Sequence, residues 1–113
     1  MPAVTYFVRM VAKHGKADEV LELLLLNPRR IEEGEPGNIA FGVHRSTEDP
    51  NEFWLYETWE SEGAVEAHES GEAFERYKRD LRPLIDPDSV IFGNTVPLKV
   101  LGYGLPAGET ARD

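Results

Sequence analysis

The 113-residue sequence contains no cysteine, which excludes disulfide bonds, thiolate nucleophiles and cysteine-ligated metal sites. No apolar run approaches the roughly 18 residues of a membrane-spanning helix, and residues 1–16 lack the pattern of a secretory signal. Basic residues are also scarce, since 12 Lys and Arg stand against 21 Asp and Glu. The resulting net charge of −9 disfavours nucleic acid and anionic membranes as partners. We therefore expect a cytoplasmic protein.

Sequence motifs of the common enzyme classes are missing as well. The chain has no phosphate-binding P-loop, no nucleophile elbow, no zinc-protease motif and no glycine fingerprint for a dinucleotide. Its three histidines, His14, His44 and His68, are too scattered to form a metal-binding motif. We therefore expect no metal and no organic cofactor, and we interpret His14 as a solvated loop residue.

The composition is that of an ordinary globular protein. Apolar residues make up 41% of the chain and aromatic residues 10%, which is enough for one hydrophobic core. We expect a single domain over residues 1–102. Residues 103–113 are rich in glycine, proline and charge, and they predict a C-terminal tail that is mobile or draped on a partner subunit.

Residue patterning predicts four strands and two helical regions. β-Branched and aromatic residues mark the strands, over residues 4–12, 38–46, 52–60 and 90–101. Apolar residues at helical spacing mark the helical regions, 16–33 with a break near Leu26-Asn27, caused by Pro28, and 61–82 with a break at Ser70-Gly71. The order βαββαβ predicts an α+β, ferredoxin-like fold, in which an antiparallel sheet carries the helices on one face.

The strand over residues 52–60 carries large apolar side chains on both faces. Trp54 and Tyr56 alternate with residues that point the opposite way, Phe53, Leu55, Glu57 and Trp59. Because the helices cover one face only, the other face would leave Trp54 and Tyr56 exposed in a monomer. We therefore expect a homodimer in which two sheets pack face to face.

Four short features carry a resemblance to a known family. They are Pro36-Gly37 before the second strand, Glu57-Thr58-Trp59 at the end of the third, Ala67-His68 in the next helix, and Phe74 in its continuation. With the element order, they resemble the antibiotic biosynthesis monooxygenase domain family over about residues 3–100. The resemblance implies a dimeric α/β barrel. For several members it also implies oxidation of phenols by O₂ without metal, flavin or haem.

The resemblance therefore implies a cofactor-independent monooxygenase that oxidises a small or polycyclic quinol, or another phenolic substrate, with O₂. In such chemistry the deprotonated substrate itself donates an electron to O₂, so the protein needs an apolar cleft and one proton acceptor. Two alternatives remain open. One is a non-catalytic small-molecule binder or signal-processing protein of the same fold, and the other is an isomerase-like protein that needs only a proton shuttle.

His68 is the candidate catalytic residue, because imidazole ordinarily titrates nearest to neutral pH. Its alternative role is packing. Trp59, Phe74 and Tyr77 are either the aromatic walls of a substrate site or core residues that pack a helix on the sheet. Glu57 is either a buried structural carboxylate or a second base.

Two further residues complete the candidate substrate-binding set. The amide of Asn38 is placed to bond a substrate oxygen or to make a turn at the start of its strand, and the same holds for Asn94. By alternation, His44 shares a strand face with Asn38, Ala40 and Gly42. These small neighbours leave either a pocket beside His44 or tight packing.

The haem-degrading branch of the superfamily is disfavoured. Its members use an Asn on the first strand, a Trp in the helix after the third strand and a His about ten residues later. The first strand of this chain has no Asn, the helix position holds His68, and Lys78 stands ten residues on.

Overall fold

The computed structural model describes residues 2–99 of the chain. The strands are β1 (Val4–Val11), β2 (Asn38–Arg45), β3 (Glu52–Trp59) and β4 (Ile91–Thr95). The helices are α1 (Ala17–Leu24), α2 (Leu26–Glu32), α3 (Glu62–Glu69) and α4 (Glu72–Leu81), and two 3₁₀ turns, Arg82–Leu84 and Pro87–Ser89, follow α4. No helix among these is long and apolar enough to cross a membrane. The predicted tail, residues 103–113, lies outside the described residues.

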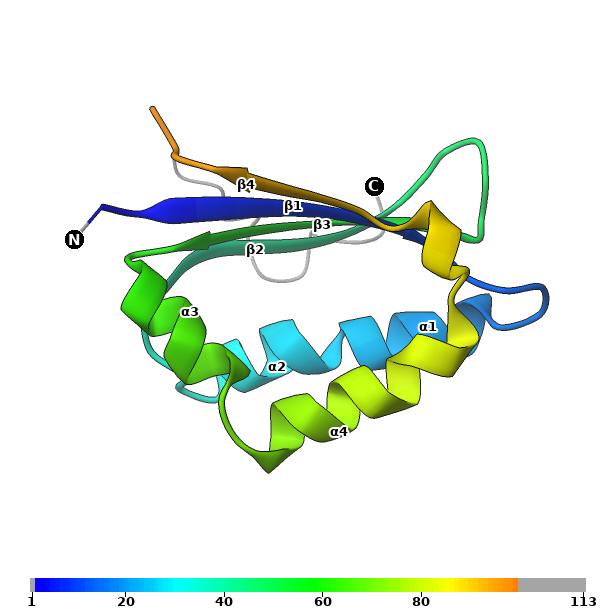
Figure 1. Cartoon of the computed structure of the whole chain (residues 1–113), viewed down its shortest axis with the longest axis horizontal. Helices are drawn as coiled ribbons and strands as arrows, with labels where there is room; N and C mark the ends of the chain where they lie inside the picture. The colour runs from blue at the N-terminus through cyan, green and yellow to red at the C-terminus, as the bar shows by residue number, and fades with distance from the viewer. Residues whose placement is uncertain (1, 100–113) are drawn as a thin grey trace.

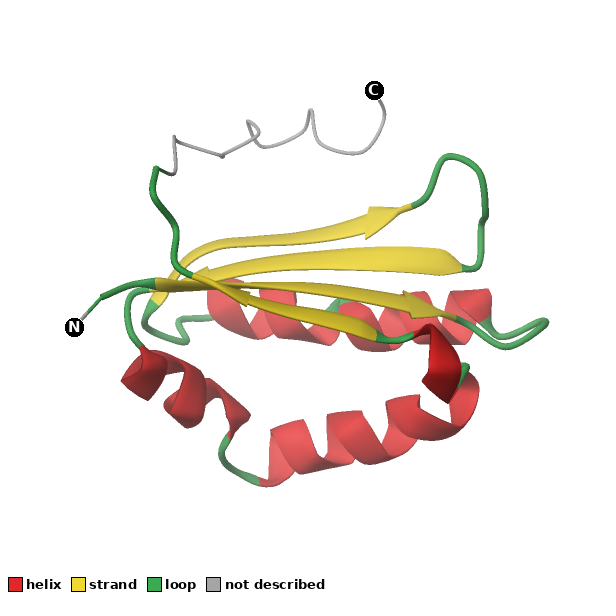
Figure 2. Cartoon of the chain, turned by 45° about the horizontal axis from the view of Figure 1, so that its top comes forward, coloured by secondary structure: helices red, strands yellow, loops and turns green. Residues whose placement is uncertain are grey.

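The four strands form one antiparallel sheet in the order β2-β3-β1-β4. The four helices of residues 2–99 lie on one side of this sheet, and none of them lies on its opposite face (Figure 1, Figure 2). Strands adjacent in sequence are not all adjacent in the sheet, because β1 lies between β3 and β4. The predicted α+β, ferredoxin-like fold is confirmed.

The last strand is shorter than predicted. The sequence indicated a strand over residues 90–101, but β4 ends where Thr95 pairs with Thr5. β1 itself begins at Val4, so almost no strand remains for β4 to pair with, and Pro97 has no N–H to donate to a ladder. In the sequence, Pro97 predicts an edge strand or a bulge, and β4 is an edge strand, since it lies at one end of the strand order.

The first helical region breaks one residue before the predicted position. The break falls at Leu25, between α1 and α2, where the sequence predicted it near Leu26-Asn27. Pro28 lies in the first turn of α2, where backbone N–H groups have no partner within the helix, so proline is tolerated there. The second region breaks at Ser70 and Gly71 as the sequence predicted.

The core lies between the sheet and the helices as two apolar clusters. The larger cluster joins β1 and β3 to α1 and α4; its buried members are Met10, Ala12, Val20, Leu24, Phe53, Leu55, Tyr77 and Leu81. The smaller one joins the sheet to α3, through Val4, Trp59 and Val65. Polar side chains gather between the two clusters, and this is where the candidate site lies.

Gly37 brings the chain close to α3 just before β2. Its φ of +92° is a conformation that other residues rarely adopt, and a Cβ on Gly37 would lie 2.7 Å from the Cβ of Ala64. The Gly37 carbonyl also accepts a hydrogen bond from the N–H of Glu60, at 2.9 Å. A glycine is therefore required at this point, and the tight approach holds the preceding turn, which contains Glu35, against α3.

The helix-free side of the sheet, called the outer face below, is apolar at its centre. Strand register places these residues on it: Thr5, Phe7, Arg9, Ala40, Gly42, His44, Trp54, Tyr56, Thr58 and Ile91. Phe7 is 44% exposed, Trp54 41% and Ile91 56%, whereas Tyr56 is half-buried against Phe7. The predicted exposure of Trp54 is confirmed.

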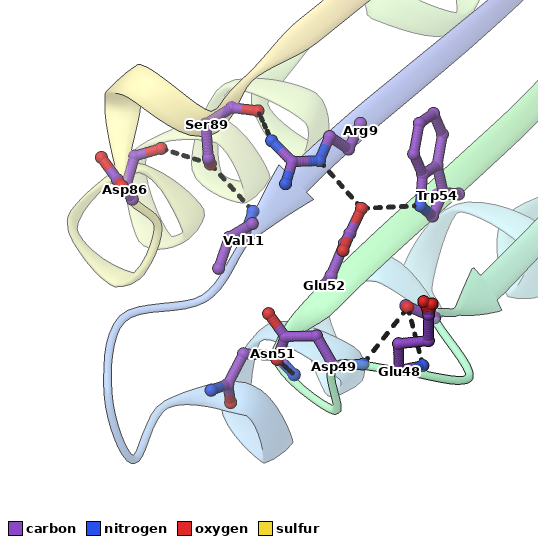
Figure 3. A network of polar contacts seen from close by, with 10 residues as sticks. Arg9, Val11, Glu48, Asp49, Asn51, Glu52, Trp54, Asp86 and Ser89 are labelled. Atoms are coloured by element: carbon purple, nitrogen blue, oxygen red, sulfur yellow. Dashed lines mark hydrogen bonds and ion pairs between the residues drawn. The ribbon is translucent and has the colours of Figure 1, made fainter.

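A polar network closes one end of the outer face (Figure 3). Arg9 donates one hydrogen bond to the Glu52 carboxylate and another to the carbonyl oxygen of Ser89, each at 2.9 Å. The indole N–H of Trp54 donates to the same carboxylate at 3.0 Å. The network ties the segment before β4 to β1 and β3, so the edge of the sheet is held in place at this end.

Candidate functional site

His68 lies between the two core clusters, in the last turn of α3. Its side chain is only 3% exposed. The imidazole centre is 4.5 Å from the Trp59 ring of β3 and 5.4 Å from the Phe74 ring of α4. Three elements thus enclose one titratable ring in an aromatic environment.

The carboxylate of Glu35 is hydrogen-bonded to Nδ1 of His68. Because an ionised carboxylate only accepts hydrogen bonds, Nδ1 is the donor, and in the neutral imidazole Nε2 carries the lone pair. The other oxygen of Glu35 lies 3.9 Å from Nε of Arg30. Arg30 in turn donates to Oδ1 of the buried Asn27, at 2.7 Å. A polar chain therefore runs from His68 through Glu35 to α2.

Tyr77 forms the next wall of the site. It is buried, and its ring centre lies 5.5 Å from that of Phe74. Burial raises the pKa of the Tyr77 hydroxyl to about 12, although a hydrogen bond with Asn27 opposes the rise. The phenol therefore keeps its proton at neutral pH. Tyr77 serves as an aromatic surface and a hydrogen-bonding group but not as a base.

Glu57 is joined to the site through Trp59. Its carboxylate accepts a hydrogen bond from the indole N–H of Trp59, at 3.0 Å. Burial raises the pKa of the Glu57 carboxyl above its usual value of 4.5, while the Trp59 bond and the nearby His68 oppose the rise. The bond orients the indole whose ring packs on His68.

Five of the predicted site residues therefore lie together. We call them the His68 cluster: Glu57, Trp59, His68, Phe74 and Tyr77. Sequence analysis missed Glu35, which bonds His68, and Asn27, which bonds Tyr77, as well as Arg30, which lies next to both. Asn27 directly follows the apolar residues 23–26, and a polar side chain at this point was the one signal available. Glu35 lies 33 positions from His68, and no local pattern connects the two.

Asn38 and His44 do not share a face of β2, contrary to the prediction. A register shift between Asn38 and Ala40 leaves Asn38 opposite Trp59, on the helix side, and His44 opposite Trp54 on the outer face. The Asn38 amide donates to the Ala40 carbonyl, at 3.1 Å. A bulge of one residue reverses the side on which every later residue of the strand points.

His44 is therefore separated from the His68 cluster by the sheet. Its ring covers Gly42, because a Cβ on Gly42 would lie 2.5 Å from Cε1 of His44. A hollow of about 320 Å³ lies beside it, lined by Phe7, His44, Trp54, Leu55 and Tyr56. The small neighbour Gly42 thus allows tight packing of the His44 ring, while the hollow beside the ring is lined by larger side chains. His14, as predicted, is exposed in the turn after β1.

A second hollow, the helix cleft, lies between α2 and α4 and adjoins the His68 cluster. It has a volume of about 220 Å³ and is lined by Leu26, Arg29, Arg30, Glu33, Ala73, Arg76, Tyr77 and Asp80. Tyr77 belongs to the cluster and also to the wall of the cleft. Within residues 2–99, no three His, Asp or Glu side chains are grouped as metal ligands would be.

The sheet order and the enclosed histidine define a small ferredoxin-like α+β domain with an aromatic site between sheet and helices. Residues 3–80 match the family model described as antibiotic biosynthesis monooxygenase. This match covers well over half of the chain, and the chain belongs to that family. The family assignment made from the sequence is confirmed.

Solved structures share this fold. A candidate antibiotic biosynthesis monooxygenase from Chloroflexus aurantiacus is 24% identical, with a TM-score of 0.75 over 90% of this chain and 99% of that one. Another from Nitrosomonas europaea is 21% identical, with a TM-score of 0.77 over 88% and 94%. SnoaB from Streptomyces nogalater, a cofactor-independent oxygenase, is 18% identical, with a TM-score of 0.73 over 89% and 98%. No curated protein matches the chain significantly.

Proposed function

We propose that the protein is a cofactor-independent monooxygenase that oxidises a small or polycyclic quinol, or a related phenol, with O₂. The observation that carries this proposal is the buried imidazole of His68, bonded to Glu35 and enclosed by Trp59 and Phe74. Family membership supports a monooxygenase-like role in general terms. The structural neighbour SnoaB is a cofactor-independent oxygenase, which supports the absence of a cofactor.

In the proposed reaction, Nε2 of His68 takes the proton of the substrate hydroxyl. The resulting anion passes one electron to O₂, and the two radicals combine at a ring carbon that bears a hydrogen, which gives a peroxide anion. His68 returns its proton to the outer peroxide oxygen to form a hydroperoxide. The O–O bond then breaks as the same carbon loses its hydrogen as a proton, so that water leaves and a carbonyl remains. One oxygen atom stays in the product, the other ends in water, and all the electrons that reduce O₂ come from the substrate. The walls formed by Trp59, Phe74 and Tyr77 exclude bulk water from these intermediates.

Glu35 is the positioning residue in this scheme. By accepting the Nδ1 proton of His68 it selects the tautomer in which Nε2 is the base, and it holds the ring in one orientation. The Nε of Arg30 lies 3.9 Å from the other carboxylate oxygen of Glu35, and the guanidinium partly balances the charge of this carboxylate. The base is thus oriented by a carboxylate that does not touch the substrate.

We further propose that the protein acts as a homodimer joined through the outer faces of its sheets. Phe7 and Trp54 are exposed side by side with the half-buried Tyr56 on a face that no helix covers. Soluble monomers rarely expose contiguous aromatic surface of this kind. A second copy presents the same surface, and two-fold packing covers both at once.

The close packing of His68 favours a second candidate, a non-catalytic binding protein of the same fold. With 3% of its side chain exposed, the imidazole fits equally well as a hydrogen-bonded part of the core, with no role as a base. In that case Glu35 would serve only to satisfy a buried ring nitrogen. The two candidates differ in whether substrate turnover depends on His68.

Oxygen uptake by the purified protein, measured over a panel of quinols and anthrones, tests the proposal. We expect O₂ consumption in a one-to-one ratio with substrate, and a fall in kcat/KM of about 10²–10⁴-fold in His68→Ala, because the general base is lost. The wild-type rate should also fall at acidic pH, since a protonated imidazole accepts no proton, and this fall should be absent in the variant.

His14→Ala is the matched control, because His14 is an exposed histidine remote from the cluster, and it should keep the wild-type rate. Circular dichroism establishes that each variant is folded. A folded His68→Ala protein that keeps more than about a third of kcat/KM would exclude the base role, because such a loss is below ~0.7 kcal/mol. No uptake with any substrate would favour the binding protein.

A further inference from the structure

We propose that the helix cleft between α2 and α4 binds an aromatic anion of one ring, a carboxylate or a phenolate, by its charged group. The inference deepens the proposed function, on which it rests, by naming the charge of the substrate. The binding site itself is argued from the cleft alone.

Three guanidinium groups line this cleft. Arg29, Arg30 and Arg76 face two carboxylates, Glu33 and Asp80. Its wall therefore carries a formal charge of +1, in a chain whose net charge is −9. The cleft is a local positive site on an acidic protein, which attracts small anions that the rest of the surface repels.

The hydrogen-bonding capacity of these arginines is largely unused. The ion pairs and side-chain hydrogen bonds found within residues 2–99 involve neither Arg29 nor Arg76. The Nε of Arg30 is buried and makes no hydrogen bond there, since the nearest oxygen of Glu35 is 3.9 Å away. This buried Nε lies on the Glu35 side, out of reach of a ligand, whereas Arg29 and Arg76 are exposed. A carboxylate, which bonds two guanidinium N–H groups at once, can therefore bind these two arginines.

The remaining wall of the cleft suits a single ring. Leu26 and Ala73 supply aliphatic surface, and Tyr77 supplies an aromatic one. The volume of about 220 Å³ is below the roughly 300–1,000 Å³ of pockets that enclose drug-sized ligands. A ring the size of benzene therefore fits, while the further rings of a polycyclic ligand would extend out of the cleft.

On both sides of the cleft, a chain of neighbouring side chains connects the lining residues to His68. On the α4 side, Tyr77 lies 5.5 Å from Phe74, whose ring is 5.4 Å from that of His68. On the α2 side, Arg30 lies 3.9 Å from Glu35, which bonds His68. An anion held by the arginines therefore places its ring next to the His68 cluster.

The test compares benzoate with benzamide, which has the same shape without the charge. Each is titrated into ¹⁵N-labelled full-length protein, and backbone amide shifts are followed by NMR. We expect benzoate to saturate shifts in α2 and around Ala73–Tyr77 of α4, and benzamide to bind at least about tenfold more weakly. Neither probe is oxidised, so the result does not depend on turnover.

Arg76→Gln is the decisive variant, because Arg76 is exposed and takes part in none of the ion pairs and side-chain hydrogen bonds found within residues 2–99. It should weaken benzoate binding about tenfold, whereas Arg82→Gln, an exposed arginine outside this cleft, should leave it unchanged. Equal affinity for benzoate and benzamide, shifts confined to other surfaces, or equal effects of the two variants would overturn the inference. If quinol oxidation is observed but benzoate fails to bind, the proposed function stands and the anion site falls.

Discussion

At the level of single residues, the titratable groups of the candidate site differ in their burial and in their hydrogen-bond partners. Tyr77, with its pKa raised to about 12 by burial, keeps its proton at neutral pH. Burial also raises the pKa of the Glu57 carboxyl, whose oxygen accepts the hydrogen bond of the Trp59 indole. His68 is hydrogen-bonded by a carboxylate and enclosed by aromatic rings, and it is the group that accepts the proton in the proposed reaction.

The environment of Glu57 predicts a pH-dependent stability. A carboxyl whose pKa is raised on folding binds protons more tightly in the native state, so stability is greatest below its usual pKa of 4.5 and is lost as pH rises through the raised value. Glu57→Gln cannot ionise, and its amide oxygen can still accept the Trp59 bond. We expect the variant to gain stability relative to wild type as pH rises from about 4 to about 8.

Urea unfolding at a series of pH values measures this difference. Glu32→Gln, which changes an exposed carboxylate at the end of α2, serves as the control and should follow the wild-type curve. A constant offset between Glu57→Gln and wild type at all pH values would show that burial does not perturb the Glu57 carboxyl.

At the level of elements, α3 is short but carries the central residue of the site. It spans Glu62–Glu69, and it begins where the side chain of Ser61 accepts a hydrogen bond from the N–H of Ala64, at 3.1 Å. This cap sets where the helix starts. The helical period then turns Val65 and His68 inward together, three residues apart.

Removing this cap should destabilise the protein by about 0.5–2 kcal/mol, since Ser61→Ala leaves an N–H at the start of α3 without its partner. Ser61→Asp, which retains an acceptor and places a negative charge at the positive end of the helix, should keep or raise the stability. Thermal or urea unfolding of the two variants provides the comparison. Equal stabilities would mean that the Ser61 hydroxyl contributes nothing to α3.

At the level of the whole molecule, the two faces of the sheet have different surroundings. The helices cover one face and form the core with it, whereas the outer face keeps an apolar centre and a polar end at Arg9 and Glu52. If two copies pack through the outer face, the aromatic centre becomes buried. The Arg9 network then lies toward the edge of the contact.

Light scattering at micromolar concentration should therefore give a mass near twice 12.7 kDa. Phe7→Lys, at the centre of the outer face, should shift the mass toward that of the monomer, because it buries a charge in the contact. Leu25→Lys, a comparably exposed apolar residue on the helix side, should leave the dimer intact. A monomeric wild-type protein would disprove this mode of assembly.

Local patterns in the sequence were sufficient for the order of elements and the family, and they singled out five residues that the structure brings together in the candidate site. Strand alternation and helical spacing depend on neighbours in the chain, so Trp59 and His68 could be placed on the helix side from their own segments. The cap at Ser61 and the break at Ser70-Gly71 are local in the same sense.

Contacts between segments that are distant in the sequence could be identified only from the tertiary structure. Glu35 meets His68 because the glycine at position 37 lets its turn approach α3, and the arginines of α2 line one cleft with Arg76 of α4, which is distant from them in the sequence. Likewise, the bulge after Asn38 moved His44 to the other side of the sheet, although alternation predicted a shared face. Such pairings depend on register and packing, which no local pattern of residue types encodes.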